Sequence, residues 1–362
     1  MADGRCVIDE NLPDPRNIQL LDPTKQFEQN YLISRLKSKD ARLKEIYEDT
    51  VYNPENISVC IGSAIVDIEV LPLEETKKFP KSEVSYFPAE IKQRAGGVAR
   101  NHAEALSRLG IDVDLISAFG IDENGNTDIG ATFLFKKLEG LKNLIDTKAE
   151  LISVADYVLI DANFPSAAIE RVFYWANRAD TKIWLDPTDA LKVPNIFNAL
   201  GERPLKNVDI FSPNLSELRS FSEYLSQKVG GSEAIECSRF VSEIEENLIN
   251  SSKINSLLLK LPFALQPRKH LIITLDRFGV LIFSRMINDE FSVEFLEAPN
   301  LRTDEISSVS GAGDCFNSGF LSATLSNFNL NKCIQVGNKC AELSLLSVET
   351  VPETLNKELL NN

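Results

Sequence analysis

The residues best suited to chemistry are those of segment 310–314, Ser-Gly-Ala-Gly-Asp, which precedes a run of helical character. Small residues let the backbone approach a ligand closely, and the first turn of a helix presents unpaired amides at its positive end. Gly311, Ala312 and Gly313 therefore form a candidate anion hole. Asp314 beside them could accept the proton of a substrate hydroxyl while the amides stabilise a transferring phosphoryl group. By itself, the segment is equally compatible with an acidic residue that only favours a helix start.

Polar residues and glycines also lie beside apolar runs elsewhere in the chain. Paired glycines at 96–97 precede a helical run that contains Asn101, and Asn214 and Glu217 stand at the start of another helix. Asp67 stands at the end of the first apolar run. Each of these features alone is more typical of a turn or a helix start than of a binding site. Only the order and spacing of these features together favour a binding site.

The elements that must position these residues alternate between strands and helices. Apolar, β-branched runs predict buried strands at 57–70, 113–120, 155–163, 182–187, 208–214 and 270–276. Helical patterns lie between or after them at 96–110, 165–178, 214–227, 239–260, 312–328 and 331–347. This alternation predicts an α/β fold with a mostly parallel sheet covered by helices on both faces. Ligands of such folds collect at the carboxyl ends of the strands.

Composition separates a polar N-terminal part from the rest of the chain and limits its partners. Residues 1–56 are predicted to form a polar extension with one helix. The 38 basic and 53 acidic residues give a formal charge of −15, which disfavours nucleic acid and anionic membrane surfaces as partners. A homodimer is a possible assembly. The start of the chain lacks the pattern of a signal peptide, so a cytoplasmic location is expected.

Histidines and cysteines are poorly placed for other chemistries. The chain has only His102 and His270, so a zinc site or a Ser/His/Asp triad would require scattered residues to converge, and neither is expected. Six cysteines without regular spacing are expected to be reduced and buried. A dinucleotide-dependent oxidoreductase is disfavoured, because no Gly-x-Gly-x-x-Gly follows the first strand.

Gly-Ala-Gly-Asp at the start of a C-terminal helix resembles the second signature of the PfkB, or ribokinase-like, carbohydrate kinase family. Segment 96–101, Gly-Gly-Val-Ala-Arg-Asn, resembles the first signature, and Asn214-Leu215-Ser216-Glu217 resembles the family's Asn-x-x-Glu motif. The resemblance covers about residues 57–352, which would form the kinase domain and leave 353–362 as a C-terminal tail. It implies a three-layer α/β/α sandwich with a small β lid, formed here by segments near 68–97 and 121–127.

The resemblance also assigns expected roles to individual residues. Asp314 would be the catalytic base with the anion hole of Gly311, Ala312 and Gly313. The remaining expected roles fall to substrate-binding Asp67, Gly96, Gly97 and Asn101, nucleotide-binding Asn214, Thr274, Gly279 and Asn338, and metal-binding Glu217 and Asp186. The implied cofactors are ATP and Mg²⁺, with K⁺ as a possible monovalent cation. The implied partner is a small sugar or nucleoside substrate.

Three segments resemble pseudouridine kinases within the family: 96–110, 185–189 and 309–314. This resemblance implies transfer of a phosphoryl group from ATP to the 5′-hydroxyl of pseudouridine. Another sugar or nucleoside remains an alternative acceptor.

The chain departs from the family pattern at three places. Ile65 stands where an Asn is common, and Asp276 stands where a Gly is common. The chain also passes from Gly120 directly to Ile121 where the family has more of the lid. A shortened lid is therefore expected, and a nucleotide-binding protein with weak or no catalysis is a further alternative, because lids exclude water and complete substrate pockets.

Overall fold

A computed structural model describes residues 57–72, 89–117, 138–249 and 260–361 of the chain. The expected N-terminal extension (1–56), the lid segment 121–127 and the junction at Gly120 and Ile121 lie outside the described residues. The division into domains at those places stays a prediction.

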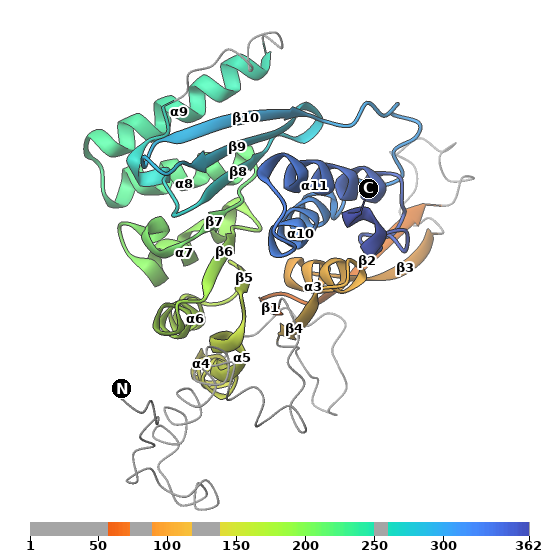
Figure 1. The fold of residues 1–362 in the computed structure, drawn as a ribbon, viewed down its shortest axis with the longest axis horizontal. Helices are drawn as coiled ribbons and strands as arrows, with labels where there is room; N and C mark the ends of the chain where they lie inside the picture. The colour runs from red at the N-terminus through yellow and green to blue at the C-terminus, as the bar shows by residue number, and fades with distance from the viewer. Residues whose placement is uncertain (1–56, 73–88, 118–137, 250–259, 362) are drawn as a thin grey trace, which may run out of the picture.

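An eight-stranded sheet forms the centre of the fold (Figure 1). Its strand order is β10-β9-β8-β7-β6-β5-β1-β4, and neighbours from β8 to β4 are parallel. β9 pairs antiparallel with β8, and the edge strand β10 pairs antiparallel with β9. The strands span β1 (Ile57–Ile61), β4 (Asp112–Ile116), β5 (Tyr157–Asp161), β6 (Lys182–Asp186), β7 (Ile210–Phe211), β8 (His270–Thr274), β9 (Gly279–Arg285) and β10 (Phe291–Glu297).

Helices cover both faces of this sheet (Figure 1). One face carries α3 (Val98–Arg108), α10 (Ala312–Leu325) and α11 (Leu330–Leu345). The opposite face carries α4 (Leu138–Thr147), α5 (Ala149–Val154), α6 (Ser166–Ala179), α7 (Val193–Leu200), α8 (Leu215–Lys228) and α9 (Gly231–Ile249). Short 3-10 helices lie at η3 (Ala190–Lys192), η4 (Pro204–Asn207), η6 (Phe263–Leu265), η7 (Asp276–Phe278) and η8 (Lys357–Leu360).

Alternate side chains of each central strand enter two separate hydrophobic cores. On β6, Ile183 and Leu185 join the core under α4–α9, whereas Trp184 points into the core under α3, α10 and α11. This division follows from the two-residue period of a strand, and it explains why the strands read as continuous apolar runs. Leu355, beyond the family-like segment, is also buried in the second core. The predicted three-layer α/β/α fold is confirmed.

The first apolar run, 57–70, was expected as one strand, and this expectation is wrong. The run divides into β1 and β2 (Ile65–Pro72), and β2 pairs with β3 (Ala89–Gly96) in a separate two-stranded antiparallel sheet. The break occurs at Gly62, where φ is +151° and a Cβ would lie 2.1 Å from the Asp161 carboxyl carbon. Only glycine fits there, and the chain must turn away from the main sheet.

The state of the cysteines and the presence of membrane-spanning helices can be compared with expectation for the described residues. Cys60, Cys237, Cys315, Cys333 and Cys340 are free and buried, as predicted. Cys6 lies outside the described residues. In the part of the chain that the structure describes, no helix is long and apolar enough to cross a membrane.

Replacing Gly319 should destabilise the contact between α10 and α11. A Cβ at this position would lie 2.7 Å from Cys340 Sγ and 3.0 Å from the backbone of Gly337. We expect Gly319→Ala to lower the free energy of unfolding by about 1–2 kcal/mol in urea denaturation, because overpacking outweighs the helix-propensity gain of alanine. Gly313→Ala in the same helix is the control, since a Cβ there meets nothing within 4 Å. Equal unfolding free energies of the two variants would contradict the close contact of α10 and α11 at Gly319.

Candidate active site

Polar side chains gather at the carboxyl edge of the main sheet, where α3 and α10 begin. Asp161 ends β5, Asp186 ends β6, and Asn214 lies three positions after the last residue of β7. Helix α3 packs against α10, and both reach this edge: Ala99 of α3 hydrogen-bonds to Asp161, and Asn317 of α10 hydrogen-bonds to Asp186. The fold therefore brings together residues that lie more than 200 positions apart in the sequence.

Asp314 lies in the first turn of α10 and is held by a neighbour from α3. The Nδ2 group of Asn101 donates a hydrogen bond of 2.6 Å to Asp314 Oδ2. The Asp314 side chain is 15% exposed, so one face of the carboxylate stays open to a ligand. The two signature segments thus meet at one carboxylate.

Gly311 shapes the start of α10. Its φ of +82° is left-handed, and a Cβ there would lie 2.4 Å from the Thr350 side chain. Glycine is required on both grounds. Gly313 faces open space instead, which leaves room for a ligand next to the amides of the first turn.

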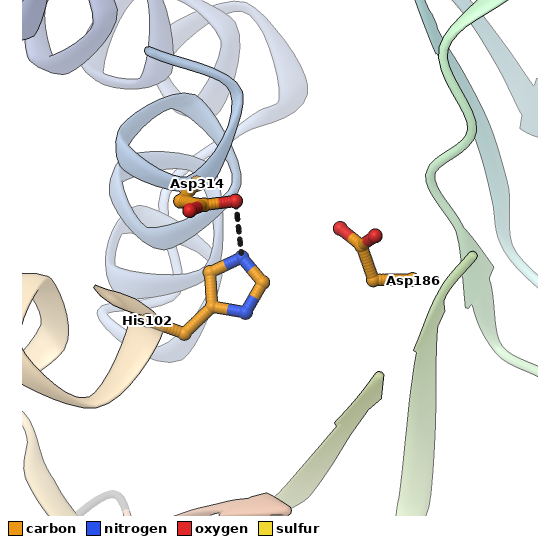
Figure 2. A group of neighbouring side chains, drawn as sticks. All are labelled: His102, Asp186 and Asp314. Atoms are coloured by element: carbon orange, nitrogen blue, oxygen red, sulfur yellow. Dashed lines mark ion pairs between the residues drawn. The ribbon is translucent and has the colours of Figure 1, made fainter. Parts of the chain in front are cut away.

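His102 also points at Asp314, from the residue after Asn101. Its Nε2 atom lies 3.9 Å from Asp314 Oδ1, and the side chain is only 2% exposed (Figure 2). Among the described residues, Nε2 has no hydrogen-bond partner. Burial lowers the pKa of this imidazole despite the attraction of Asp314 and Asp161.

Asp186 is buried at the end of β6 and faces the same space (Figure 2). Its Oδ1 accepts the Thr188 amide at 2.8 Å, and its Oδ2 accepts Asn317 Nδ2 at 3.2 Å. Burial, with repulsion from Glu217 and Asp314, raises the pKa of Asp186 well above its usual range.

Glu217 is fixed at the start of α8 by a reciprocal cap with Asn214. The backbone N–H of Asn214 donates to Glu217 Oε2 at 2.8 Å, and the backbone N–H of Glu217 donates to Asn214 Oδ1 at 2.9 Å. Burial, partly offset by the backbone hydrogen bond of Asn214, raises the pKa of Glu217 to about 7. Repulsion from Asp189 and Asp314 adds to this shift.

Asp161 positions the loop between β1 and β2 and the start of α3. Its Oδ2 accepts hydrogen bonds from the Ser63 amide at 2.7 Å, the Ser63 hydroxyl at 2.8 Å and the Ala99 amide at 3.2 Å. Burial raises its pKa, although these hydrogen bonds oppose the shift. The carboxylate thereby ties β1, β5 and α3 together.

The paired glycines 96–97 join the two-stranded sheet to the main body. Gly97 has a φ of +98°, and a Cβ there would lie 2.4 Å from the Ser63 carbonyl oxygen. That carbonyl also accepts the Arg100 amide at 3.1 Å. The close approach of Gly97 and Ser63 therefore sets where β3 ends and α3 begins.

The expected nucleotide-binding residues lie in three places. Asn214 and Thr274 form a parallel bridge next to each other at the sheet edge. Gly279 opens β9 with a φ of +118°, and a Cβ there would lie 2.0 Å from the Leu296 carbonyl oxygen, so its glycine is already required by strand pairing. Asn338 is a partly buried residue of α11.

Asp67 was expected at the end of the first strand and instead lies inside β2, opposite Arg94. The reason is the break at Gly62, which moves this residue from the main sheet into the two-stranded one. The placement of its side chain lies outside what the structure describes.

The residues present fit a nucleotide with a divalent cation. Asp186, Glu217 and Asp314 repel one another, and a cation between them would relieve that repulsion. Asp186 and Glu217 would hold the cation, directly or through its water, and the amides of Gly311–Gly313 would face phosphate oxygens. The cation would neutralise part of the negative charge of the phosphates.

Sequence reasoning missed three buried residues of the site: His102, Asp161 and Asn317. Asp161 had a detectable signal, since it ends a predicted parallel strand as Asp186 does. His102 and Asn317 had none beyond their nearness to Asn101 and Asp314, because their orientation depends on how α3 and α10 pack.

Comparison with known proteins identifies the family. The model of the pfkB family carbohydrate kinases matches residues 56–128 and 131–355. The chain is 23% identical to a pseudouridine kinase of Arabidopsis thaliana, over 84% of this chain and 94% of that protein. It is 22% identical to a nucleoside kinase of Methanocaldococcus jannaschii, over 77% and 86% of the two chains.

Solved structures agree on the fold. Arabidopsis thaliana ribokinase, complexed with ribose and ATP, is 16% identical with a TM-score of 0.54, covering 85% of this chain and 98% of that one. A probable sugar kinase of Rhizobium etli is 18% identical with a TM-score of 0.56 and covers 86% and 98%. The chain belongs to the PfkB family of carbohydrate kinases, and it is a sugar or nucleoside kinase of that type.

Removing the charge of Asp161 should destabilise the protein. The groups that hydrogen-bond to the Asp161 carboxylate all act as donors. The side-chain NH₂ group of an introduced Asn would therefore face one of these donors. We expect Asp161→Asn to lower the free energy of unfolding by about 2–4 kcal/mol. The control is Asp156→Asn, at an exposed position where the carboxylate accepts the Ile57 amide. Similar denaturation midpoints for both variants would contradict the positioning role of Asp161.

Stability without divalent cations should depend on Glu217. Its folded pKa of about 7 exceeds the usual 4.5, so the folded state holds this proton more tightly than the unfolded state. Folding therefore loses stability as pH rises from 4.5 to about 7, on the order of 1–3 kcal/mol, and the loss stays complete above that range.

The measurement is denaturation against pH in a chelator, with wild type compared with Glu217→Gln. We expect wild type to lose stability relative to the variant as pH rises through this window, because the variant has no proton to release there. Glu223→Gln, at an exposed position on α8, is the control. A difference that does not vary with pH would contradict the assignment.

Proposed function

We propose that this chain transfers the γ-phosphoryl group of ATP to the 5′-hydroxyl of pseudouridine, in the presence of Mg²⁺. The observation that carries the proposal is the contact between Asn101 and Asp314. It joins the residue expected to bind the sugar to the residue expected to remove the hydroxyl proton, at the first turn of α10.

Asp314 is the catalytic base in this proposal. Its carboxylate is partly exposed, and Asn101 fixes one of its oxygens. The other oxygen could accept the proton of the attacking hydroxyl, while the amides of 311–313 stabilise the charge on the transferring group. Asp186 and Glu217 hold the metal, and Asn214, Thr274, Gly279 and Asn338 lie on the nucleotide side.

The sugar contacts rest on the two-stranded sheet and its junction. Asp67 in β2, Gly96, Gly97 and Asn101 belong to a continuous path from this sheet to the base. Ser63 hydrogen-bonds to both Asp161 and the backbone of Val98, so a movement of the two-stranded sheet would displace the start of α3. This sheet is the part expected to act as the lid.

Pseudouridine is the first choice of acceptor because of the resembling segments and the Arabidopsis relative. A different nucleoside is the second candidate, supported by the Methanocaldococcus relative of nearly equal identity. A nucleotide-binding protein with weak catalysis remains the alternative from another class. A set of acceptors separates these three.

Phosphorylation of pseudouridine, uridine, adenosine and ribose should be measured with ATP and Mg²⁺. We expect selective turnover of pseudouridine. Turnover of another acceptor alone would replace the substrate, and ATP-dependent thermal stabilisation without turnover would favour the nucleotide-binding alternative.

Asp314→Asn should slow turnover by roughly 10²–10⁴-fold and leave the Kd for ATP little changed, because the amide cannot accept the proton. The matched control is Asp304→Asn, at an exposed position in the loop before α10. Turnover of Asp314→Asn within about threefold of wild type would refute the role of this residue.

A further inference from the structure

The site contains a buried nitrogen ligand that phosphoryl transfer leaves unused. His102 Nε2 has no hydrogen-bond partner among the described residues and faces Asp314 at 3.9 Å. An unpaired polar atom in a buried place is costly unless something occupies the space beside it. Here that space is bounded by two carboxylates, Asp186 and Asp314 (Figure 2).

We propose that His102, Asp186 and Asp314 form a binding site for a first-row transition-metal dication, of which Zn²⁺ is the representative. This ion would share Asp186 with the Mg²⁺ that accompanies the nucleotide, but it would take His102 and Asp314 in place of Glu217. The low histidine count argued against such a site, but folding brings the imidazole of α3 to carboxylates of β6 and α10. The binding site stands on this geometry and does not depend on the acceptor substrate.

The distances require only a small closure. The candidate ligand atoms of the three residues all lie within 4.8 Å of one another. Ligands at about 2.1 Å from a tetrahedral Zn²⁺ would lie about 3.4 Å apart. Asn101 holds Asp314 Oδ2, so Oδ1, the oxygen nearer to His102, remains available. Small side-chain rotations could bring these atoms to a shared ion.

The ligand types favour a transition metal over Mg²⁺. Mg²⁺ prefers oxygen ligands, whereas Zn²⁺, Co²⁺ and related ions bind imidazole well. His102 Nε2 has no hydrogen-bond partner among the described residues, so no neighbouring donor or acceptor competes with a metal for this nitrogen. Two carboxylates balance the charge of the dication.

Two buried amide oxygens could support the water that completes the coordination. Asn101 Oδ1 and Asn317 Oδ1 have no hydrogen-bond partner among the described residues. Asn101 donates to Asp314, and Asn317 donates to Asp186. Each free oxygen therefore belongs to a residue that already holds a ligand, as is common around metal ions.

Occupation of the site would inhibit a kinase that uses Asp314 as its base. A lone pair committed to a metal cannot accept the proton of a hydroxyl, and a Zn²⁺ ion would exclude the acceptor from the same space. This consequence, unlike binding itself, rests on the proposed function. Zn²⁺ should therefore reduce turnover at saturating Mg²⁺.

Binding should be measured on the full chain without nucleotide, after treatment with a chelator. Calorimetric titration with Zn²⁺ gives the Kd, and visible absorption with Co²⁺ reports the ligand types. We expect one site whose Co²⁺ spectrum lacks the charge-transfer band of thiolate ligands. We expect His102→Gln to weaken binding at least roughly 10-fold, the lower end of what loss of an outer partner alone causes.

His270→Gln is the matched control, because it removes the only other histidine. That residue is buried and contacts Ser284 rather than the site. We expect it to bind Zn²⁺ as wild type does. If His102→Gln fails to fold by circular dichroism, Asp314→Asn tests the same site and should also weaken Zn²⁺ binding.

The outcomes separate the two proposals. Wild-type affinity in His102→Gln and Asp314→Asn, or a thiolate band in the Co²⁺ spectrum, would overturn the metal site. Zn²⁺ binding that depends on His102 in a chain without kinase activity would support the metal site and refute the proposed function. Kinase activity that Zn²⁺ does not reduce, despite such binding, would refute the role of Asp314 as base.

Discussion

The burial of carboxylates at one edge of the sheet is the constraint on which the site depends. Asp161, Asp186 and Glu217 are all nearly inaccessible to solvent, and a buried charge is costly unless donors surround it. Each carboxylate therefore fixes a turn: Asp161 fixes the Ser63 loop, Asp186 the turn at Thr188, and Glu217 the start of α8. The geometry of the edge follows from meeting these hydrogen-bonding requirements.

Hydrogen bonds do not remove the repulsion among these groups. The pKa values of Glu217 and Asp186 stay raised because both carboxyl groups are buried and because neighbouring acidic groups repel their charged forms. Asp314 differs in being partly exposed, and Asn101 of α3 holds only one of its two oxygens. The edge therefore has two parts: buried carboxylates that suit a cation, and one accessible carboxylate that can meet a substrate.

The sequence predicted those parts of the fold that depend on local pattern. Strands such as β5 and β6 are apolar on both faces, and segment 310–314 carries its own helix-start chemistry, so the layers and the position of Asp314 could be inferred. Gly62 shows the limit of that reasoning, because its need for glycine comes from the Asp161 carboxyl, 99 positions away. Asp67 was misplaced for that reason. His102 was discounted because its significance depends on the packing of α3 against α10.

Asn101 and His102 show how one helix turn can give a carboxylate two competing uses. Asn101 binds one oxygen of Asp314 and so orients the other toward both the acceptor space and His102. A hydroxyl needs only that oxygen, whereas a transition metal needs the oxygen, the imidazole and Asp186 together. Mg²⁺ gains little from the imidazole. Under the two proposals, the same pre-oriented carboxylate would serve catalysis with Mg²⁺ and would also bind an ion that prefers nitrogen, and His102 would determine whether the second use exists.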